Sequence, residues 1–163
     1  MALKLTKGVS SSFRRTYDVF LSFRGTDTCK TFVDNLYTAL AHEGIFTFRD
    51  DPTLERGSIS SELIRAIEES RIAVVIFSRS YASSSFCLDE LVTILKCREE
   101  MGQTVIPVFY HVDPSDVRRQ KGSFAEAFVE HEERFQENLE TVETWRSALT
   151  QVASLSGWHL QDG

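Results

Sequence analysis

The sequence contains no run of about 20 apolar residues, which is the length a helix needs to cross a bilayer. Its first 16 residues lack the apolar core of a secretory signal. They are basic, contain serine and carry no acidic side chain, which weakly resembles an organelle transit peptide. Because the segment is short and has no clear amphipathic face, we interpret residues 1–16 as a disordered lead-in and expect no membrane partner.

Cysteine and histidine are also scarce. The three cysteines cannot all pair with one another, and an odd, sparse set is typical of reduced thiols in the cytoplasm. The four histidines are scattered, and no cysteine or histidine stands at the spacing of a zinc site, so we predict no metal. The formal net charge is −6 without a long basic run, which makes nucleic acid an improbable partner. We expect a cytoplasmic or nucleocytoplasmic protein.

Several glycine-rich and nucleophile motifs are missing. No G-x-G-x-x-G follows the first predicted strand, and no phosphate loop of the G-x-x-x-x-G-K-[ST] type occurs. A serine hydrolase would need a G-x-S-x-G elbow, which is also absent. A phospho-acceptor receiver domain would place an aspartate after the third strand, where this sequence has Ser78. Dinucleotide oxidoreductases, P-loop enzymes, serine hydrolases and receivers are therefore excluded.

The sequence does contain hydrophobic strand-like runs that alternate with helical patterns. Four such runs occupy residues 17–23, 45–49, 72–77 and 104–110, and Trp158–Leu160 is a candidate for a fifth. This alternation predicts βαβ units and a parallel sheet, because unbroken apolar strands are covered on both faces. We predict an α/β, flavodoxin-like, doubly wound three-layer sandwich with four to five strands. Pro107 removes a donor from its strand and predicts an edge position or a bulge.

The most informative stretch joins the third strand to a helix. Ile72–Phe77 is a continuous apolar run, and a serine-rich loop containing Tyr81 follows it. A helical pattern then opens at Phe86, and we place Glu90 in the first turn of that helix. Ligands of α/β proteins lie outside the carboxyl ends of parallel strands, so Glu90 is the candidate functional acid. The alternative is a glutamate that only complements the helix dipole.

Seven motifs follow one another along the chain. They are YDVFLSFRG (Tyr17–Gly25), FRDD (Phe48–Asp51), LERG (Leu54–Gly57), AIEES (Ala66–Ser70), CLDEL (Cys87–Leu91), VFYHVDPSDVR (Val108–Arg118) and SGWHL (Ser156–Leu160). Together they resemble plant Toll/interleukin-receptor (TIR) domains, the amino-terminal domains of intracellular nucleotide-binding leucine-rich-repeat immune receptors. The resemblance covers residues 17–160, which we assign as one TIR domain, with 161–163 as a tail.

The resemblance implies an enzyme that cleaves NAD+ between nicotinamide and ribose, with NAD+ as substrate and no cofactor. The products of such domains act as signals for defence and cell death. The catalytic glutamate of the family falls on Glu90. The resemblance also implies a substrate-binding set, which consists of Arg24, Gly25, Asp50, Asp51, Ser84 and Phe86. For Phe86, which stands where the family commonly has tryptophan, a core aromatic is an equally good interpretation.

The resemblance further implies self-association through two faces, one around Asp34 and Asn35 and one beginning at Gly122. The expected partners are further copies of the chain, other TIR domains and downstream immune proteins. The sequence departs from the family pattern at Cys29, where arginine is usual, at Asn35, at Phe86, at Ala125 and in the short loop after Gly57. Two alternatives therefore stay open: a non-catalytic TIR–TIR scaffold and, less favoured by the charge, an enzyme acting on nucleic acid.

Overall fold

The computed structural model of the chain describes residues 16–25, 29–49 and 59–161. Five strands form one parallel sheet in the order β2-β1-β3-β4-β5. The elements in chain order are β1 (Tyr17–Ser22), α2 (Lys30–His42), β2 (Thr47–Arg49), α3 (Ser61–Glu68), β3 (Ser70–Phe77), the 3-10 turn η2 (Tyr81–Ser83), α4 (Ser85–Met101), β4 (Thr104–Tyr110), α5 (Pro114–Arg119), α6 (Ser123–Arg134), η3 (Gln136–Asn138), α7 (Leu139–Ala153) and β5 (Trp158–Leu160).

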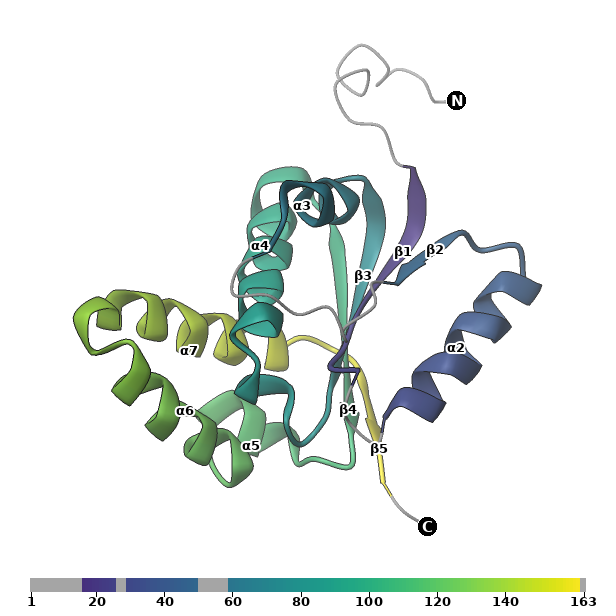
Figure 1. The fold of residues 1–163 in the computed structure, drawn as a ribbon. Coiled ribbons are helices and arrows are strands. Elements are labelled where there is room, and N and C mark those ends of the chain that lie inside the picture. The colour runs from purple at the N-terminus through teal and green to yellow at the C-terminus, as the bar shows by residue number, and fades with distance from the viewer. Residues whose placement is uncertain (1–15, 26–28, 50–58, 162–163) are drawn as a thin grey trace.

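Helices cover both faces of this sheet. Helix α2 packs on one face, and α3, α4 and α7 lie on the other, with α5 and α6 beside them (Figure 1). Strand β3 shows why, because its successive side chains point to opposite faces. Ala73, Val75 and Phe77 belong to the larger core under α3, α4 and α7, whereas Ile76 belongs to the core under α2. The predicted three-layer α/β sandwich and the fifth strand are confirmed.

The α2 layer leaves part of its sheet face open. An apolar pocket of about 220 Å³ lies beside α2. It is lined by side chains of β1, α2, β3, β4 and β5, namely Val19, Phe32, Leu36, Leu40, Val74, Ile106, Val108, Trp158 and Leu160.

Among the helices of the described residues, none is both long enough and apolar enough to cross a membrane.

Local signals in the sequence set the helix ends. The side chain of Ser60 accepts a hydrogen bond from the Leu63 amide and caps α3. Gly102 ends α4 with φ at +72°, a left-handed conformation that glycine adopts without steric cost. Residues 114–119 form α5, a short helix where the sequence analysis did not anticipate one. Asp113 caps that helix by accepting from the Ser115 amide, and Pro114 occupies its first turn.

The prediction that Pro107 marks an edge strand or a bulge is wrong. Strand β4 lies between β3 and β5, and Pro107 pairs in register with Val75. The carbonyl of Pro107 points towards Gly157, the residue that precedes β5. The N–H and C=O of one residue point to the same side of a strand, so an N–H at position 107 would also point towards the β5 side. The pairing of β4 with β5 begins only at the next residue, Val108. No ladder hydrogen bond is lost there.

Helices α4 and α7 are joined by a hydrogen bond between two side chains. The indole Nε1–H of buried Trp145 donates to Oδ1 of Asp89 at 3.0 Å. Partial burial raises the pKa of the Asp89 carboxyl, and the Trp145 bond opposes the rise. The folded chain therefore holds this proton more tightly than the unfolded chain does. The ionised carboxylate costs stability above its folded pKa, and this cost disappears as the pH falls through that pKa.

Replacing Asp89 with asparagine is expected to leave the thermal unfolding temperature at neutral pH unchanged or slightly higher. The amide oxygen still accepts from Trp145, and no charge has to be desolvated. Any excess in the unfolding temperature of Asp89→Asn over that of the wild type should become smaller on acidification, because the wild-type Asp89 carboxyl then becomes neutral too. Thermal unfolding followed by circular dichroism at neutral and acidic pH measures the difference. A clear loss of stability at neutral pH, larger than at acidic pH, would contradict this interpretation.

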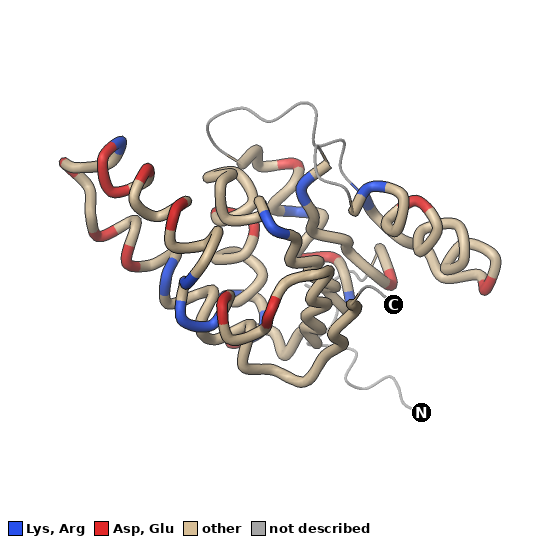
Figure 2. Tube along the Cα trace, turned by 90° about the horizontal axis from the view of Figure 1, so that it is seen from below, with Lys and Arg blue, Asp and Glu red and all other residues tan. Residues whose placement is uncertain are grey.

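The acidic side chains concentrate on one part of the molecule. Figure 2 shows them spaced along the α6–α7 helix pair on the left. Seven glutamates between residues 126 and 143 belong to this surface, and all seven are exposed: Glu126, Glu130, Glu132, Glu133, Glu137, Glu140 and Glu143. Arg146 pairs with Glu132 across the two helices and lies over the Phe128 ring. These glutamates therefore form a solvated face.

Candidate functional site

The candidate site lies at the carboxyl edge of the sheet, where β1 and β3 end. Glu90 projects there from α4 and is only 3% exposed. The helix begins at Ser85, so its first turn contains no acidic residue and Glu90 lies in the second turn. The placement of Glu90 in the first turn is therefore wrong by one turn. Because Glu90 is buried and lies beyond the first turn, the alternative of a glutamate that only complements the helix dipole loses its support.

One buried hydroxyl group bonds to the Glu90 carboxylate, and a second bonds to the first. The Ser22 hydroxyl, at the end of β1, donates to Glu90 Oε1 at 2.7 Å. The Tyr81 hydroxyl lies 2.8 Å from Ser22 Oγ and 3.2 Å from the Cys87 carbonyl oxygen. Both Ser22 and Tyr81 are fully buried. The Cys87 thiol donates to the carbonyl of Phe23 at 3.7 Å, so β1 and α4 are joined at two points beside the carboxylate.

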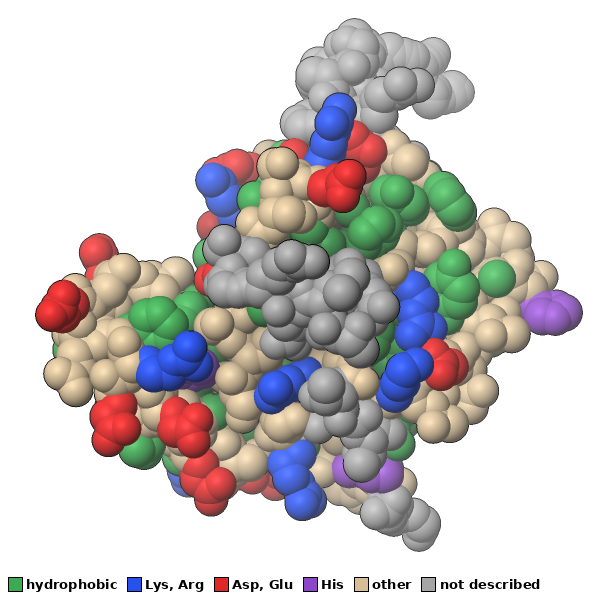
Figure 3. All heavy atoms as spheres, viewed as in Figure 1, with side chains coloured by type: hydrophobic (Ala, Val, Ile, Leu, Met, Phe, Trp, Pro, Cys, Tyr) green, Lys and Arg blue, Asp and Glu red, His purple; other side chains and the backbone are tan. Residues whose placement is uncertain are grey.

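The loop after β1 contributes Arg24 and Gly25. The Arg24 guanidinium donates through Nη1 to the Ser80 carbonyl at 3.1 Å, which ties the end of β1 to the loop after β3. Gly25 is buried beside it. Cys29, which stands where the family usually has arginine, is fully buried and its thiol donates to the Arg24 carbonyl at 3.7 Å. On the face of the molecule that Figure 3 shows, Lys and Arg side chains lie near the middle.

Two further predicted site residues lie at the start of α4. Ser84 is buried, and its hydroxyl accepts from the Cys87 amide at 3.1 Å, so it caps the helix that carries Glu90. Phe86 is half-buried and packs against the main core. Its core interpretation thus has structural support, while contact with a substrate ring stays a prediction. Asp50 and Asp51 lie outside the described residues.

The predicted self-association residues lie on two separate helices. Asp34 and Asn35 are on α2, where Asp34 pairs with Arg49 at 2.8 Å and with Lys30 at 3.4 Å. The Arg49 guanidinium lowers the pKa of Asp34 and also lies over a ring of the same helix, that of Tyr37. Gly122 precedes α6 with φ at +60° and is exposed. The two positions belong to different surfaces of the chain.

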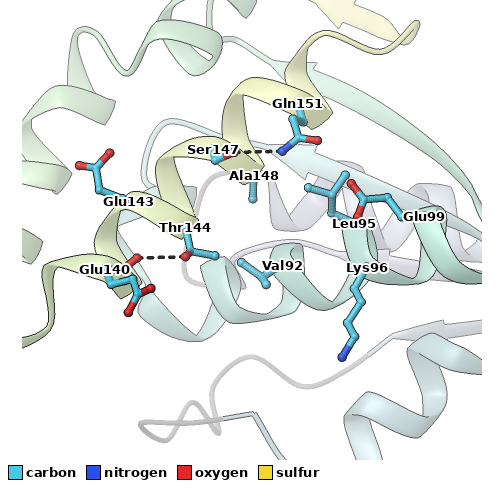
Figure 4. Close-up of a pocket in the computed structure, with 10 residues that line it drawn as sticks. All are labelled: Val92, Leu95, Lys96, Glu99, Glu140, Glu143, Thr144, Ser147, Ala148 and Gln151. Atoms are coloured by element: carbon cyan, nitrogen blue, oxygen red, sulfur yellow. Dashed lines mark hydrogen bonds between the residues drawn. The ribbon is translucent and has the colours of Figure 1, made fainter.

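Two other concave regions lie outside this network. A polar pocket of about 290 Å³ lies at the ends of β4 and β5, lined by Arg79, His111, Val112, Asp113, His159 and Gln161. A groove of about 390 Å³ runs between α4 and α7, with Val92, Leu95 and Ala148 on its apolar side (Figure 4). Neither includes Glu90. In the described part of the chain, no group of three or more His, Cys, Asp or Glu residues could hold a metal ion.

Comparison with known proteins places this geometry in a family. Residues 16–163 match the family described as "TIR domain". The chain belongs to the TIR domain family. This TIR domain is 56% identical over 147 residues to the disease resistance protein RPV1 of Vitis rotundifolia and 56% identical over 149 residues to the TMV resistance protein N of Nicotiana glutinosa. The alignments cover 90% and 91% of this chain but only 10% and 13% of those proteins.

A solved structure supports the same assignment. The TIR domains in the structure of the activated Roq1 resistosome, which directly recognises the pathogen effector XopQ, superpose with a TM-score of 0.83. The identity is 56%, and the match covers 89% of this chain and 88% of that one. The predicted resemblance to plant TIR domains is confirmed. Because this chain spans about a tenth of its full-length relatives, what those proteins do as a whole is not transferred to it directly.

Sequence analysis of this TIR domain missed the two hydroxyl groups around Glu90. Ser22 is the one serine in β1, where it follows an apolar run, and Tyr81 is the one aromatic residue in the serine-rich loop. Ser22 is a polar residue at the end of an apolar run, and Tyr81 is a bulky residue in a loop of small ones. Both departures from the local pattern are visible in the sequence. Their meaning became clear only when the fold brought three segments together over sequence separations of 59 and 68 residues.

Proposed function

We propose that this TIR domain is an NAD+ nucleosidase that acts in its self-associated state and signals plant immune defence and cell death. The observation that carries the proposal is the buried Glu90 carboxylate at the carboxyl edge of the sheet, held by Ser22 and joined through it to Tyr81. Its 56% identity to plant disease resistance proteins supports the signalling role. We place the domain in the cytoplasm, where NAD+ is available as substrate.

One carboxylate is sufficient for this reaction. The bond between the ribose C1′ and the nicotinamide nitrogen breaks, and its electron pair stays with nicotinamide, which leaves as a neutral molecule. No general acid is needed, unlike in the hydrolysis of an ordinary glycoside. Positive charge develops on the ribose, and an anion in a buried site stabilises it more strongly than one in water does. Water then adds at C1′ and releases a proton, which completes hydrolysis to nicotinamide and ADP-ribose.

Self-association is the second part of the proposal. One relative of known structure comes from the activated Roq1 resistosome, which contains TIR domains in the plural. In this chain Asn35 is exposed on α2, and Gly122 is exposed before α6. These two surfaces would join copies of the chain to one another or to other TIR domains. Further immune proteins would act downstream of the assembly or of the products.

A non-catalytic scaffold is the second candidate function, and two observations favour it. Cys29 is buried and carries no charge where the family usually offers a cation near the substrate. Phe86 packs against the core, which leaves less of its ring for stacking on a substrate. If these departures remove turnover, TIR–TIR contacts would still recruit partners. In that case substitution at Glu90 would leave defence signalling unchanged, whereas substitution on the association surfaces would reduce it.

The test is the dependence of NAD+ cleavage on protein concentration. Nicotinamide release should rise faster than linearly with concentration of the wild-type domain in the presence of a crowding agent. Asn35→Glu adds a second negative charge beside Asp34 and should reduce both association and the rate at a given concentration. Light scattering on the same samples reports association. Self-association without nicotinamide release would overturn the enzyme proposal and favour the scaffold.

A further inference from the structure

Glu90, Ser22 and Tyr81 come from three different elements and form one buried chain of hydrogen-bonding groups. Glu90 belongs to α4, Ser22 ends β1, and Tyr81 begins η2. The two links measure 2.7 Å and 2.8 Å, and the chain continues from the Tyr81 hydroxyl to the Cys87 carbonyl at 3.2 Å. A buried network of this kind stabilises a unique arrangement when each member has a partner.

The number of available protons determines which group donates and which accepts in each of these hydrogen bonds. Ser22 has a single hydroxyl proton, and it is donated to Glu90 Oε1. Ser22 Oγ must therefore accept a hydrogen bond from the Tyr81 hydroxyl. When Glu90 is ionised, its oxygens can only accept, and the order of donation is then Tyr81 to Ser22 to Glu90. If Glu90 takes up a proton, the same heavy atoms permit the reverse order, in which Tyr81 donates to the Cys87 carbonyl.

Tyr81 is well suited to stay a donor. Burial raises the pKa of its phenol well above the ordinary range, and the neighbouring Cys87 and Glu90 add to the effect. The phenol therefore stays protonated at neutral pH. The Tyr81 phenol from η2 thus interacts with two titratable groups of α4, the Cys87 thiol and the Glu90 carboxyl. Arg24, which follows β1, bonds to the Ser80 carbonyl.

The turn that carries Tyr81 is itself fixed from α6. His131 is buried, and its Nε2 lies 2.7 Å from the Ala82 carbonyl oxygen. This bond assigns the ring proton to Nε2, because a carbonyl can only accept. The Tyr81 ring also packs edge-on against Phe77 at 5.1 Å between centroids. The phenol oxygen is thus held at one place relative to the end of β1.

We propose that Tyr81 and Ser22 are positioning residues that fix the orientation of the Glu90 carboxylate and favour its ionised form through a directed hydrogen-bond relay. This inference rests on the proposed NAD+ cleavage for its catalytic consequence, but the relay itself exists independently of turnover. Neither residue touches the reacting atoms. Removing the phenol oxygen leaves Ser22 without its donor, which frees the serine hydroxyl to adopt other orientations and weakens its bond to Glu90.

Nuclear magnetic resonance of the Tyr81 ring tests the relay without relying on activity. The chain has four tyrosines, so ring Cζ labelling gives few signals, and single Tyr→Phe variants assign them. The Tyr81 signal should move on acidification of the wild type, as the relay reverses when Glu90 becomes protonated. It should stay constant over the same range in Glu90→Gln and in Ser22→Ala. A constant signal in the wild type, or the same movement in Glu90→Gln, would overturn the relay.

Kinetics of Tyr81→Phe test the consequence. We expect kcat for nicotinamide release to fall roughly tenfold with little change in KM, because the Ser22–Glu90 bond that is weakened is a hydrogen bond to a charged group. The acid limb of the pH–rate profile should move to higher pH. Tyr110→Phe, which removes a hydroxyl outside the relay, is the matched control and should keep the wild-type profile. An unchanged profile in Tyr81→Phe, with the wild type active, would overturn the positioning role and leave the proposed function standing.

Discussion

Replacing Glu90 with glutamine is expected to lower kcat for nicotinamide release by about 10²–10³-fold or more, the effect of removing one group that stabilises transition-state charge. Glutamine keeps the size of the side chain and an oxygen that accepts from Ser22. The fold should therefore survive, while the negative charge opposite the developing oxocarbenium ion is lost. Initial rates of nicotinamide formation, measured by chromatography at saturating NAD+, give the comparison.

Asp89→Asn is the matched control for this variant. It neutralises the adjacent carboxylate in the same helix, but Asp89 bonds to Trp145 and lies outside the relay. We expect its rate to stay within about twofold of the wild type, since it removes no interaction with the reacting centre. Circular dichroism of both variants should show the wild-type spectrum. If Glu90→Gln retained the rate of Asp89→Asn, Glu90 would not be the catalytic group.

The second large effect is on stability and arises at Gly157. A Cβ atom at this position would lie 1.9 Å from the Pro107 carbonyl oxygen and 2.8 Å from Pro107 Cγ. The obstacle includes backbone of the central part of β4, which cannot rotate away as a flexible side chain could. Gly157→Ala is therefore expected to destabilise the domain by about 3 kcal/mol, at the upper end for overpacking. Equilibrium unfolding in urea measures this loss.

Gly44→Ala separates steric overlap from loss of backbone freedom. Gly44 has φ at +76°, but a Cβ atom there would meet nothing within 4 Å. The expected cost is about 1–2 kcal/mol, the ordinary penalty for an L-residue in the left-handed region. Gly157 is exposed, so its surface position alone gives no warning of the effect. Equal stability of Gly157→Ala and the wild type would show that β4 and β5 can separate at low cost.

The layers of the fold were predictable because each central strand is covered on both faces. Strands β3 and β4 contain short apolar runs rich in β-branched residues, which is typical of strands buried on both faces. Shorter elements were harder to predict. Helix α5 has six residues, too few to show a helical period, although Asp113 followed by Pro114 is a helix-start signal. The placement of Glu90 was one turn early because the cap is Ser84, two residues before the first apolar residue of the pattern.

The candidate site was predictable only in part. Glu90 was predicted from the strand–loop–helix pattern and again from the resemblance, whereas Arg24 and Ser84 came from the resemblance alone. The fold brings all three to the carboxyl edge of the sheet. Ser22 and Tyr81 could not be predicted as partners of Glu90, because their contact depends on the parallel register of β1 and β3. Pro107 shows the same limit. Its tolerance depends on where β5 begins, which no local pattern around residue 107 reveals.

The most direct test of the central claim is the amount of nicotinamide that the wild-type domain releases from NAD+ at a concentration where light scattering shows self-association. Our account predicts continuing release over many turnovers, with loss of NAD+ and gain of nicotinamide in equal amounts. Nicotinamide at the level of a protein-free sample, in a sample shown to be folded and associated, would contradict the account. The buried Glu90 would then serve the structure of a scaffold rather than a reaction.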